Sequence, residues 1–259
     1  MHDGLISALI DAFALPPEAR VDRRISKATL IERAPRSADR KIIESQIARL
    51  DWVAEMSPGT VRIPALADPP APAINVLVLT PAKPATMRLK DMIHWLIPAP
   101  IVLLTRLAGG LDGESDGGIE LSLARKRTAQ RVEGVVSEGL TLAPPLPDPP
   151  DAVAAAFIAS LALGGLPQTN LWALYEALCV RVEALDAARA ANAAFRLPAN
   201  SGEAVERRAA LGYWHLADVQ WSIARGAAKK EKRLAQAVAL GEKARKLKAL
   251  RDAAAAALA

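Results

Sequence analysis

The sequence has a single cysteine, few aromatic residues and no long apolar run. One cysteine, Cys179, excludes an internal disulfide and a zinc site built from several cysteines. Aromatic residues make up only 4% of the 259 residues, so the core must consist mainly of aliphatic side chains and alanine. The longest nearly uncharged run, 152–166, is shorter than the roughly 20 residues that span a bilayer, and the N-terminus lacks the basic start of a signal peptide. We therefore expect a soluble, cytoplasmic protein.

The motifs of common enzymes and metal sites are also missing. None of His2, His94 and His215 has a second histidine four residues away, the spacing that presents two metal ligands on one helix. No glycine-rich stretch has the spacing of a phosphate-binding loop or a dinucleotide fingerprint. The loop 112–123 begins like a calcium-binding loop, but Leu123 stands where a bidentate carboxylate is required. The sequence therefore predicts no cofactor, no metal and no catalytic residue, and it favours a protein that is not an enzyme.

A divergent metal-dependent nuclease is the alternative. Such an enzyme needs carboxylates, usually with a lysine, on adjacent strands to hold a divalent ion. Residues 71–87 contain Lys83 but no acid, and the expected strand 99–107 contains no acid either. Glu120 and Glu133 lie on expected strands, without a lysine two residues later. If the protein is a nuclease, its metal-binding carboxylates must therefore come from residues that are distant in the sequence and meet only in the folded structure.

Hydrophobic periodicity predicts two regions of different class. Residues 1–143 are expected to form an α/β (α+β) domain with a mixed sheet, 144–151 a proline-rich linker, and 152–259 an all-α helical domain that ends in a basic helix. In the first region we expect helices over 3–14, 38–56 and 86–96, strands over 60–65, 73–80, 99–107 and 119–127, and one or two more strands within 131–143. In the second region we expect helices over 151–163, 169–194, 202–225 and 227–257.

Positive charge is concentrated at the C-terminal end. Residues 229–252 carry nine lysines and arginines against three acids, while the whole chain has a net charge of only +5. We predict that these cations contact nucleic acid or a partner protein. The predicted contact residues are Lys229, Lys230, Lys232, Arg233, Lys243, Arg245, Lys246 and Lys248.

The last helix carries an apolar stripe as well as its charge. Lys243 and Arg251 interrupt this stripe, which consists of Leu240, Ala244, Leu247, Ala254 and Leu258. Three interpretations stay open: a docked helix with solvated charge, a helix that binds a phosphate backbone, and a helix that pairs with a partner helix. Residues 222–259 contain no aromatic residue, so base stacking on this helix is not expected.

A second group of cations lies near the N-terminus. Residues 18–41 hold eight basic residues against four acids. We predict that Arg23, Arg24 and Lys27 contact phosphates or an acidic partner, since the arginine fork can hold two phosphate oxygens. The alternative is that interleaved acids pair with these groups on the surface. These acids are Asp22, Glu32 and Asp39.

Several stretches together resemble one family. "FALPPEARVDRRISKATL" followed by "IARLDWVAEMSPGTVRIPA" resembles the opening of domain-of-unknown-function family 4391. "LKDMIHWLIPAPIVLLTRL", "LYEALCVRV" and "KKEKRLAQAVALGEKARKLKAL" are similar to its centre, the start of its helical part and its ending. The chain departs from the family at Asp22, Gly241 and Arg233-Leu234-Ala235, where the family has amide or Gln-Phe-Asn residues.

Members of this family often stand beside helicases and DNA methyltransferases in bacterial restriction or phage-defence clusters. The resemblance therefore implies a non-catalytic adaptor or nucleic-acid-binding subunit of such a system. It also implies DNA, and a helicase or DNA methyltransferase subunit, as partners. Such a genomic association implies no particular reaction.

Overall fold

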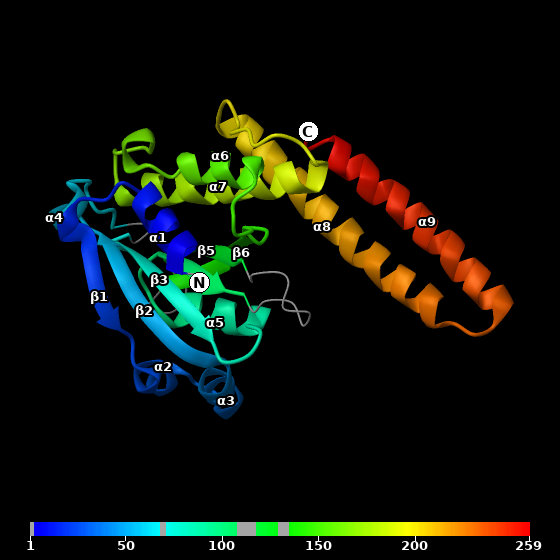
Figure 1. The fold of residues 1–259 in the computed structure, drawn as a ribbon, viewed down its shortest axis with the longest axis horizontal. Helices are drawn as coiled ribbons and strands as arrows, with labels where there is room; N and C mark the ends of the chain where they lie inside the picture. The colour runs from blue at the N-terminus through cyan, green and yellow to red at the C-terminus, as the bar shows by residue number, and fades with distance from the viewer. Residues whose placement is uncertain (1–2, 68–70, 108–117, 129–134) are drawn as a thin grey trace. The chain divides into compact units, whose positions relative to one another are not determined.

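The fold is described from a computed structural model (Figure 1). The structure describes residues 3–67, 71–107, 118–128 and 135–259. The chain divides into two compact units, Met1–Val182 and Glu183–Ala259. The proline-rich segment 144–151 lies inside the first unit.

The first unit is built on one six-stranded mixed sheet. The strands follow one another across the sheet in chain order, with β3 and β4 parallel and the other neighbours antiparallel. The strands are β1 Arg20–Arg24, β2 Ile47–Met56, β3 Ile74–Pro81, β4 Ile101–Arg106, β5 Ile119–Thr128 and β6 Val135–Leu142. The helices are α1 Asp3–Ala12, α2 Lys27–Arg33, α3 Ser37–Gln46, α4 Pro58–Val61, α5 Met87–Leu96, α6 Ala152–Ala159 and the first part of α7 Leu171–Ala191, with short 3-10 turns η1 Pro17–Ala19 and η2 Leu163–Gly165.

Helices α2, α3 and α5 cover one face of this sheet. Ile43 of α3 and Ile93 of α5 pack in one buried cluster with Leu77 of β3 and Leu103 of β4. Alternate positions of β3 and β4 point to the other face and are largely buried as well, so both faces are covered, as is usual around a parallel strand pair. The expected α/β domain with a mixed sheet, followed by helices, is confirmed.

A buried tyrosine fastens α7 to this sheet. The Tyr175 hydroxyl donates a hydrogen bond to the Ile101 carbonyl oxygen at 2.9 Å and accepts one from the Ala124 N–H at 2.9 Å. Burial raises the pKa of this hydroxyl well above its ordinary value. The phenol therefore stays neutral and links the helix to β4 and β5.

The expected helix over 38–56 is wrong in its second half. Helix α3 ends at Gln46, and the next ten residues form β2. The buried residues of β2 are Ile47, Leu50, Ala54 and Met56, and their first spacings of three and four resemble a helix face. Two register irregularities in the pairing of β2 with β3 produce this spacing, because an extra residue in a strand shifts the buried side by one position.

In this unit, as far as the structure describes it, one expected strand is absent and one observed strand was not expected. The strand expected over 60–65 is absent from the described residues; α4 begins one residue after Ser57, whose backbone N–H donates to the Thr60 hydroxyl in a capping box. Strand β1 was not predicted, because its sequence, "RVDRR", has only one apolar residue and lies exposed at the sheet edge. The charged side chains of β1 suit an edge strand, which they protect from pairing with other chains.

The second unit is a helical hairpin joined to the end of α7. Helices α8 Ser201–Lys230 and α9 Leu234–Ala256 run side by side (Figure 1). The side chain of Asn200 caps α8 by accepting a hydrogen bond from the Glu203 N–H at 3.0 Å. The expected break between 225 and 227 is wrong, because α8 continues through Gly226 and the turn comes at 231–233.

Arg251 links the two helices of the hairpin. Its guanidinium lies 4.1 Å from the centroid of the Trp221 ring and 3.4 Å from the Asp218 carboxylate, both on α8. The charge that interrupts the apolar stripe in the sequence is therefore a contact between helices. Lys243, the other interrupting residue, is exposed, while Leu258 packs with Leu211 in a small buried cluster.

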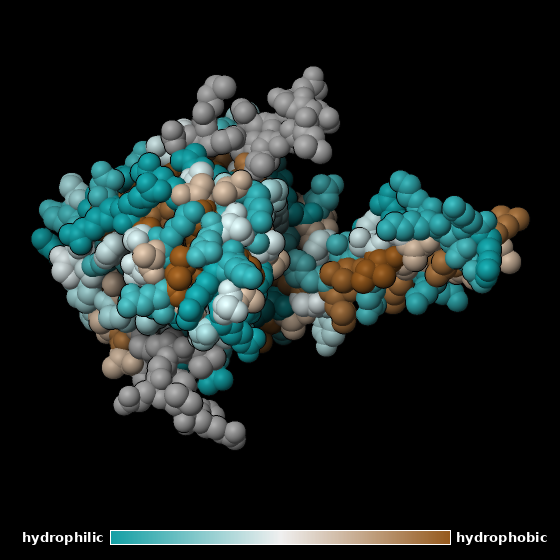
Figure 2. Space-filling model, turned by 90° about the horizontal axis from the view of Figure 1, so that it is seen from below, coloured by the Kyte–Doolittle hydropathy of each residue, from teal (hydrophilic) through white to brown (hydrophobic). Residues whose placement is uncertain are grey.

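The hairpin leaves much apolar surface exposed. Along α8, a row of exposed residues recurs every three or four positions: Val205, Ala209, Gly212, Leu216, Val219 and Ile223. Figure 2 shows hydrophobic residues interspersed with hydrophilic ones on this hairpin. Within the described ranges, none of these helices has the length and apolar character needed to cross a bilayer.

Candidate nucleic-acid interface

All eight cations predicted at the C-terminal end are exposed. Lys229 and Lys230 end α8, while Lys232 and Arg233 lie in the turn. The remaining four follow on α9: Lys243, Arg245, Lys246 and Lys248. We call these eight residues the hairpin cations.

The charge of the hairpin cations is largely unneutralised. Lys248 pairs with Asp252 at 2.5 Å, and this hydrogen bond lowers the pKa of the Asp252 carboxyl. Within the described ranges, the side chains of the other seven form no ion pair with an acid. Since one helical residue advances about 100°, Lys243 and Lys246 lie on one flank of α9, and Arg245 and Lys248 lie on the other. A phosphate backbone lying along α9 would contact one flank.

The structure brings two of the three N-terminal candidates together. Arg24 and Lys27 line a cavity of about 350 Å³ with Ser26, Arg49 and the backbone of β2. Arg24 donates to the Ala48 carbonyl oxygen at 3.3 Å, and Lys27 donates to the Glu44 carbonyl oxygen at 3.4 Å. These bonds position the two cations without neutralising them.

Arg23 does not line the Arg24 cavity. It is exposed on β1, where successive side chains point to opposite faces, so it is directed away from Arg24. The expectation that Asp39 pairs with these three cations is wrong, because Asp39 pairs with Arg88. In the described part of the chain, no ion pair joins Asp22 or Glu32 to a cation.

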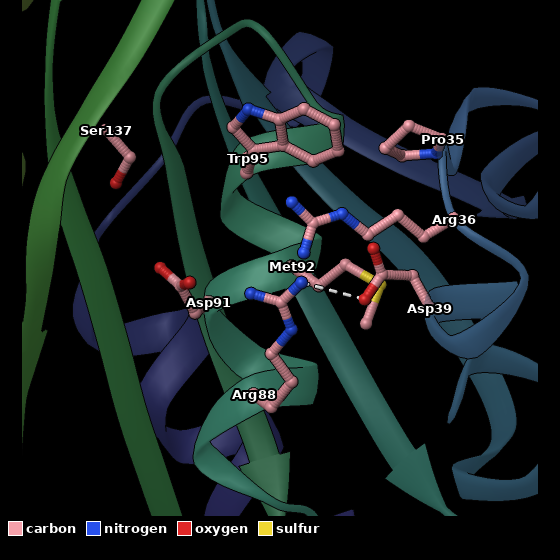
Figure 3. Close-up of a pocket in the computed structure, with 8 residues that line it drawn as sticks. All are labelled: Pro35, Arg36, Asp39, Arg88, Asp91, Met92, Trp95 and Ser137. Carbon is pink, nitrogen blue, oxygen red and sulfur yellow. Dashed lines mark hydrogen bonds and ion pairs between the residues drawn. The ribbon is translucent and has the colours of Figure 1, made fainter. Parts of the chain in front are cut away.

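A second cavity, of about 280 Å³, lies between α3, α5 and β6 (Figure 3). Arg88 on α5 holds the Asp39 carboxylate of α3 at 2.7 Å, and this hydrogen bond raises the pKa of the guanidinium. Trp95 lines the cavity, and the residue is 47% exposed. The lining residues are Pro35, Arg36, Asp39, Arg88, Asp91, Met92, Trp95 and Ser137. We call this cavity the Trp95 pocket.

Polar side chains also lie buried between α5 and β5. Lys90 pairs with Glu120, and the His94 Nε2 atom lies 3.0 Å from the Ser122 hydroxyl. The second pair has the spacing of a nucleophile and its base. However, both residues are fully buried, and no described residue hydrogen-bonds the His94 Nδ1 atom. Burial lowers the pKa of His94 to about 3, so the imidazole stays neutral and this pair serves to align α5 with β5.

Lys126 closes the end of α5. Its ammonium donates to three carbonyl oxygens, those of His94 at 2.8 Å, Ile97, and Ala99 at 2.9 Å. Helix ends leave such carbonyl groups without a partner, and a cation suits the negative end of the helix dipole. Burial lowers the pKa of Lys126 to about 7. The lysine is a structural cap.

Metal-binding geometry is absent from the described residues, where no three His, Cys, Asp or Glu side chains group closely enough to hold an ion. The calcium-like positions 112–117 and the candidate Glu133 lie outside the described residues. Glu120, the other nuclease candidate, is engaged by Lys90. Cys179 is buried inside α7, as expected for a small apolar residue.

Sequence reasoning missed the Trp95 pocket. Its two arginines, Arg36 and Arg88, are distant in the chain, and no motif connects them. One signal was present. The buried face of α5 consists of Leu89, Met92, Ile93 and Leu96, and an aromatic residue outside that stripe should face solvent, as Trp95 does.

Comparison with known proteins gives one family. A family model described as a domain of unknown function (DUF4391) matches residues 13–250. No curated protein and no solved structure matches the chain. The resemblance seen in the sequence is thereby confirmed over most of the chain.

Proposed function

We propose that this chain, which belongs to the DUF4391 family of domains of unknown function, is a non-catalytic nucleic-acid-binding subunit. DNA is the expected ligand, and the hairpin cations are its main contacts. The resemblance described above extends the proposal to a bacterial restriction or phage-defence system, with a helicase or DNA methyltransferase as the partner subunit. The choice of DNA and of the partner subunit rests on the resemblance and is associational, whereas the proposal that the chain binds phosphate groups rests on its exposed cations.

The proposal rests on the exposure of the hairpin cations and on the near absence of acidic partners for them among the described residues. Eight cations are exposed within one helical hairpin, and among described residues only Lys248 meets an acid. Cations that are not neutralised by the protein can replace the counterions around phosphates, and this exchange supplies most of the affinity in sequence-independent binding. The cavity at Arg24 and Lys27 supports the proposal with a second pair of cations, whose partners among the described residues are carbonyl oxygens.

No observation favours the nuclease alternative over this function. Among described residues Glu120 is paired with Lys90, and no group of metal ligands is found. A binding subunit requires only an exposed cationic surface and no catalytic group.

The test is the salt dependence of DNA binding by the full chain and by the triple variant K243Q/R245Q/K246Q. Each phosphate contact that is lost should reduce the slope of log affinity against log salt by about 0.9. We expect weaker binding with a shallower slope. Substitution is a better test than truncation after Gly226, because that cut falls inside α8 and removes the packing partner of Leu211.

A matched control removes three cations that already face an acid. R20Q/R127Q/R196Q makes the same formal charge change, but these residues pair with Asp11, Glu138 and Glu203. This control should retain most of the affinity and slope. The proposed role of the hairpin would be contradicted if both triple variants lost the same DNA affinity. It would also be contradicted if the α9 variant kept the parent's slope of log affinity against log salt.

A further inference from the structure

We propose that the Trp95 pocket binds one unpaired nucleobase of single-stranded nucleic acid, with guanine preferred. This inference goes beyond the proposed function, which rests on charge and names no base. It depends on that function only for the class of ligand. The hairpin cations and the Trp95 pocket lie in different units of the chain, so the two sites can be tested separately.

Trp95 provides the pocket with an exposed aromatic surface. Trp95 is 47% exposed, although its neighbours His94 and Leu96 on the same helix are 0% and 5% exposed. The indole ring therefore keeps a large apolar surface in solvent beside a cavity. Stacking on such a ring is a common way for proteins to hold an unpaired base, because every base has a π-face. An exposed tryptophan at a pocket thus favours a flat aromatic ligand.

The polar groups of the pocket fit the edge of a base. Asp91 forms no hydrogen bond or ion pair within the described residues. The buried Ser137 hydroxyl oxygen has no hydrogen-bond partner there either. In Figure 3, these two groups lie on one side of the pocket, and Arg36 lies on the other, below Trp95. The pocket thus offers one carboxylate acceptor, one hydroxyl and one guanidinium fork.

Guanine matches this set of groups best. Its N1–H and N2–H₂ groups are adjacent donors that a single carboxylate such as Asp91 can accept. Its O6 and N7 atoms are adjacent acceptors, the pair that arginine reads most often in nucleic acids. Thymine offers a single donor, and adenine and cytosine offer one amino group each, so they satisfy the carboxylate less completely.

The other acid of the pocket does not compete for the ligand. Asp39 is held at 2.7 Å by Arg88, and the carboxylate is almost fully buried. Arg88 also attracts the Asp91 carboxylate electrostatically. Among the described residues no hydrogen bond joins the two, so the Asp91 oxygens can still accept from a base. The volume of about 280 Å³ lies just below the range typical for whole drug-sized ligands, which suits one base with its sugar and phosphate outside.

Arginines near the pocket can contact the phosphates on either side of the bound nucleotide. Besides Arg36, which faces the base, Arg33 and Arg40 are both exposed. Arg33 donates to the Leu96 carbonyl oxygen at 3.4 Å, next to Trp95, and Arg40 donates to the Ala34 carbonyl oxygen at 3.0 Å. Bonds to carbonyl groups leave these charges unneutralised. A strand whose base enters the pocket would thus find cations for its flanking phosphates.

The test uses the full chain with two labelled probes: a single-stranded nonamer of thymidines with a central guanosine, and a duplex of the same sequence. W95A should weaken binding of the single strand about tenfold, the effect of removing one stacking contact. It should leave duplex binding unchanged, because a paired base cannot enter the pocket. W95F should retain most of the affinity. Y213A, which removes an exposed aromatic residue in the other unit, is the matched control and should change nothing.

The guanine preference is tested by D91N against an all-thymidine nonamer. D91N should remove the preference for the guanosine probe and leave thymidine binding unchanged. The pocket proposal is overturned if W95A binds the single strand as tightly as the parent, if it loses duplex binding equally, or if D91N keeps the preference. Binding of an acidic aromatic peptide in place of either probe would overturn it too. If the parent binds neither probe, the proposed function fails together with it.

Discussion

The sheet unit and the helical hairpin use similar aliphatic side chains in opposite ways. Leu103 in the sheet is 0% exposed, whereas Leu216 on α8 is 58% exposed. Charged groups differ in the same direction, since Lys90 and Lys126 are buried with partners and the hairpin cations face solvent. Burial stabilises the first unit and gives Lys90 and Lys126 partners inside the protein. In the hairpin, many apolar side chains are exposed, and the hairpin cations remain accessible to a ligand.

The largest expected effect is a difference in unfolding free energy between the same substitution, Leu→Ala, at Leu103 and at Leu216. Leu103→Ala should cost about 3 kcal/mol of unfolding free energy, because it leaves a cavity in the packed cluster. Leu216→Ala should change the free energy by less than about 0.5 kcal/mol, because the side chain already meets water. Calorimetric unfolding of both variants measures the difference. Similar losses at the two positions would show that α8 is covered in solution, and would end the contrast between the units.

Removal of the Lys126 cap should have an intermediate effect. Lys126→Met keeps a long apolar side chain but leaves three carbonyl oxygens at the end of α5 without a donor. Unpaired buried polar groups are costly, so we expect a loss of about 2 kcal/mol. Chemical denaturation measures the loss, and Lys243→Met on the exposed side of α9 is the control, with no expected change. A stable K126M protein would mean that α5 does not depend on this cap.

The smallest expected effect is a pH dependence in the hairpin unit. The hydrogen bond of His215 to Asp186 at 2.6 Å raises the pKa of the imidazole above its ordinary 6.5, and Asp218 acts in the same direction. A raised pKa in the folded state stabilises the fold fully below the unfolded pKa, and this contribution is lost as pH rises through the folded pKa. The side chain is 55% exposed, so the contribution should stay below about 1 kcal/mol.

The His215 contribution is measured as the difference in Tm between the parent and His215→Gln. The difference should be larger at pH 5.5 than at pH 8.5. A constant difference across this range would mean that the ion pair with Asp186 adds nothing to the hydrogen bond.

Sequence reasoning predicted the fold class and most elements, and it failed where local pattern and structure diverge. Strand β3 and helix α5 follow ordinary periodicity, and both were predicted. Strand β2 was predicted as helix because its register irregularities give Ile47, Leu50 and Ala54 helical spacing. No local rule reveals such an irregularity, since it is defined by pairing with a partner strand distant in sequence.

Of the two candidate sites, one could be predicted from the sequence and the other could not. The hairpin cations lie close together in sequence, so a count of charges along the chain is enough to find them. The Trp95 pocket combines α3, α5 and β6, and the sequence holds no motif that joins them. The alternative in which Asp39 pairs with Arg23, Arg24 or Lys27 failed for the same reason, because those cations are near it in the sequence whereas the fold brings Arg88 to it.

The order of the strands bears on how the chain reaches its fold. Since the sheet runs from β1 to β6 in chain order, every strand after the first pairs with one that has already been synthesised. Only the step from β3 to β4 needs a crossover, and α5 supplies it. Contacts close in sequence speed folding, and domains generally fold as units during synthesis at the ribosome. The sheet, which ends at Leu142, can therefore assemble strand by strand during synthesis, before the cationic hairpin is translated.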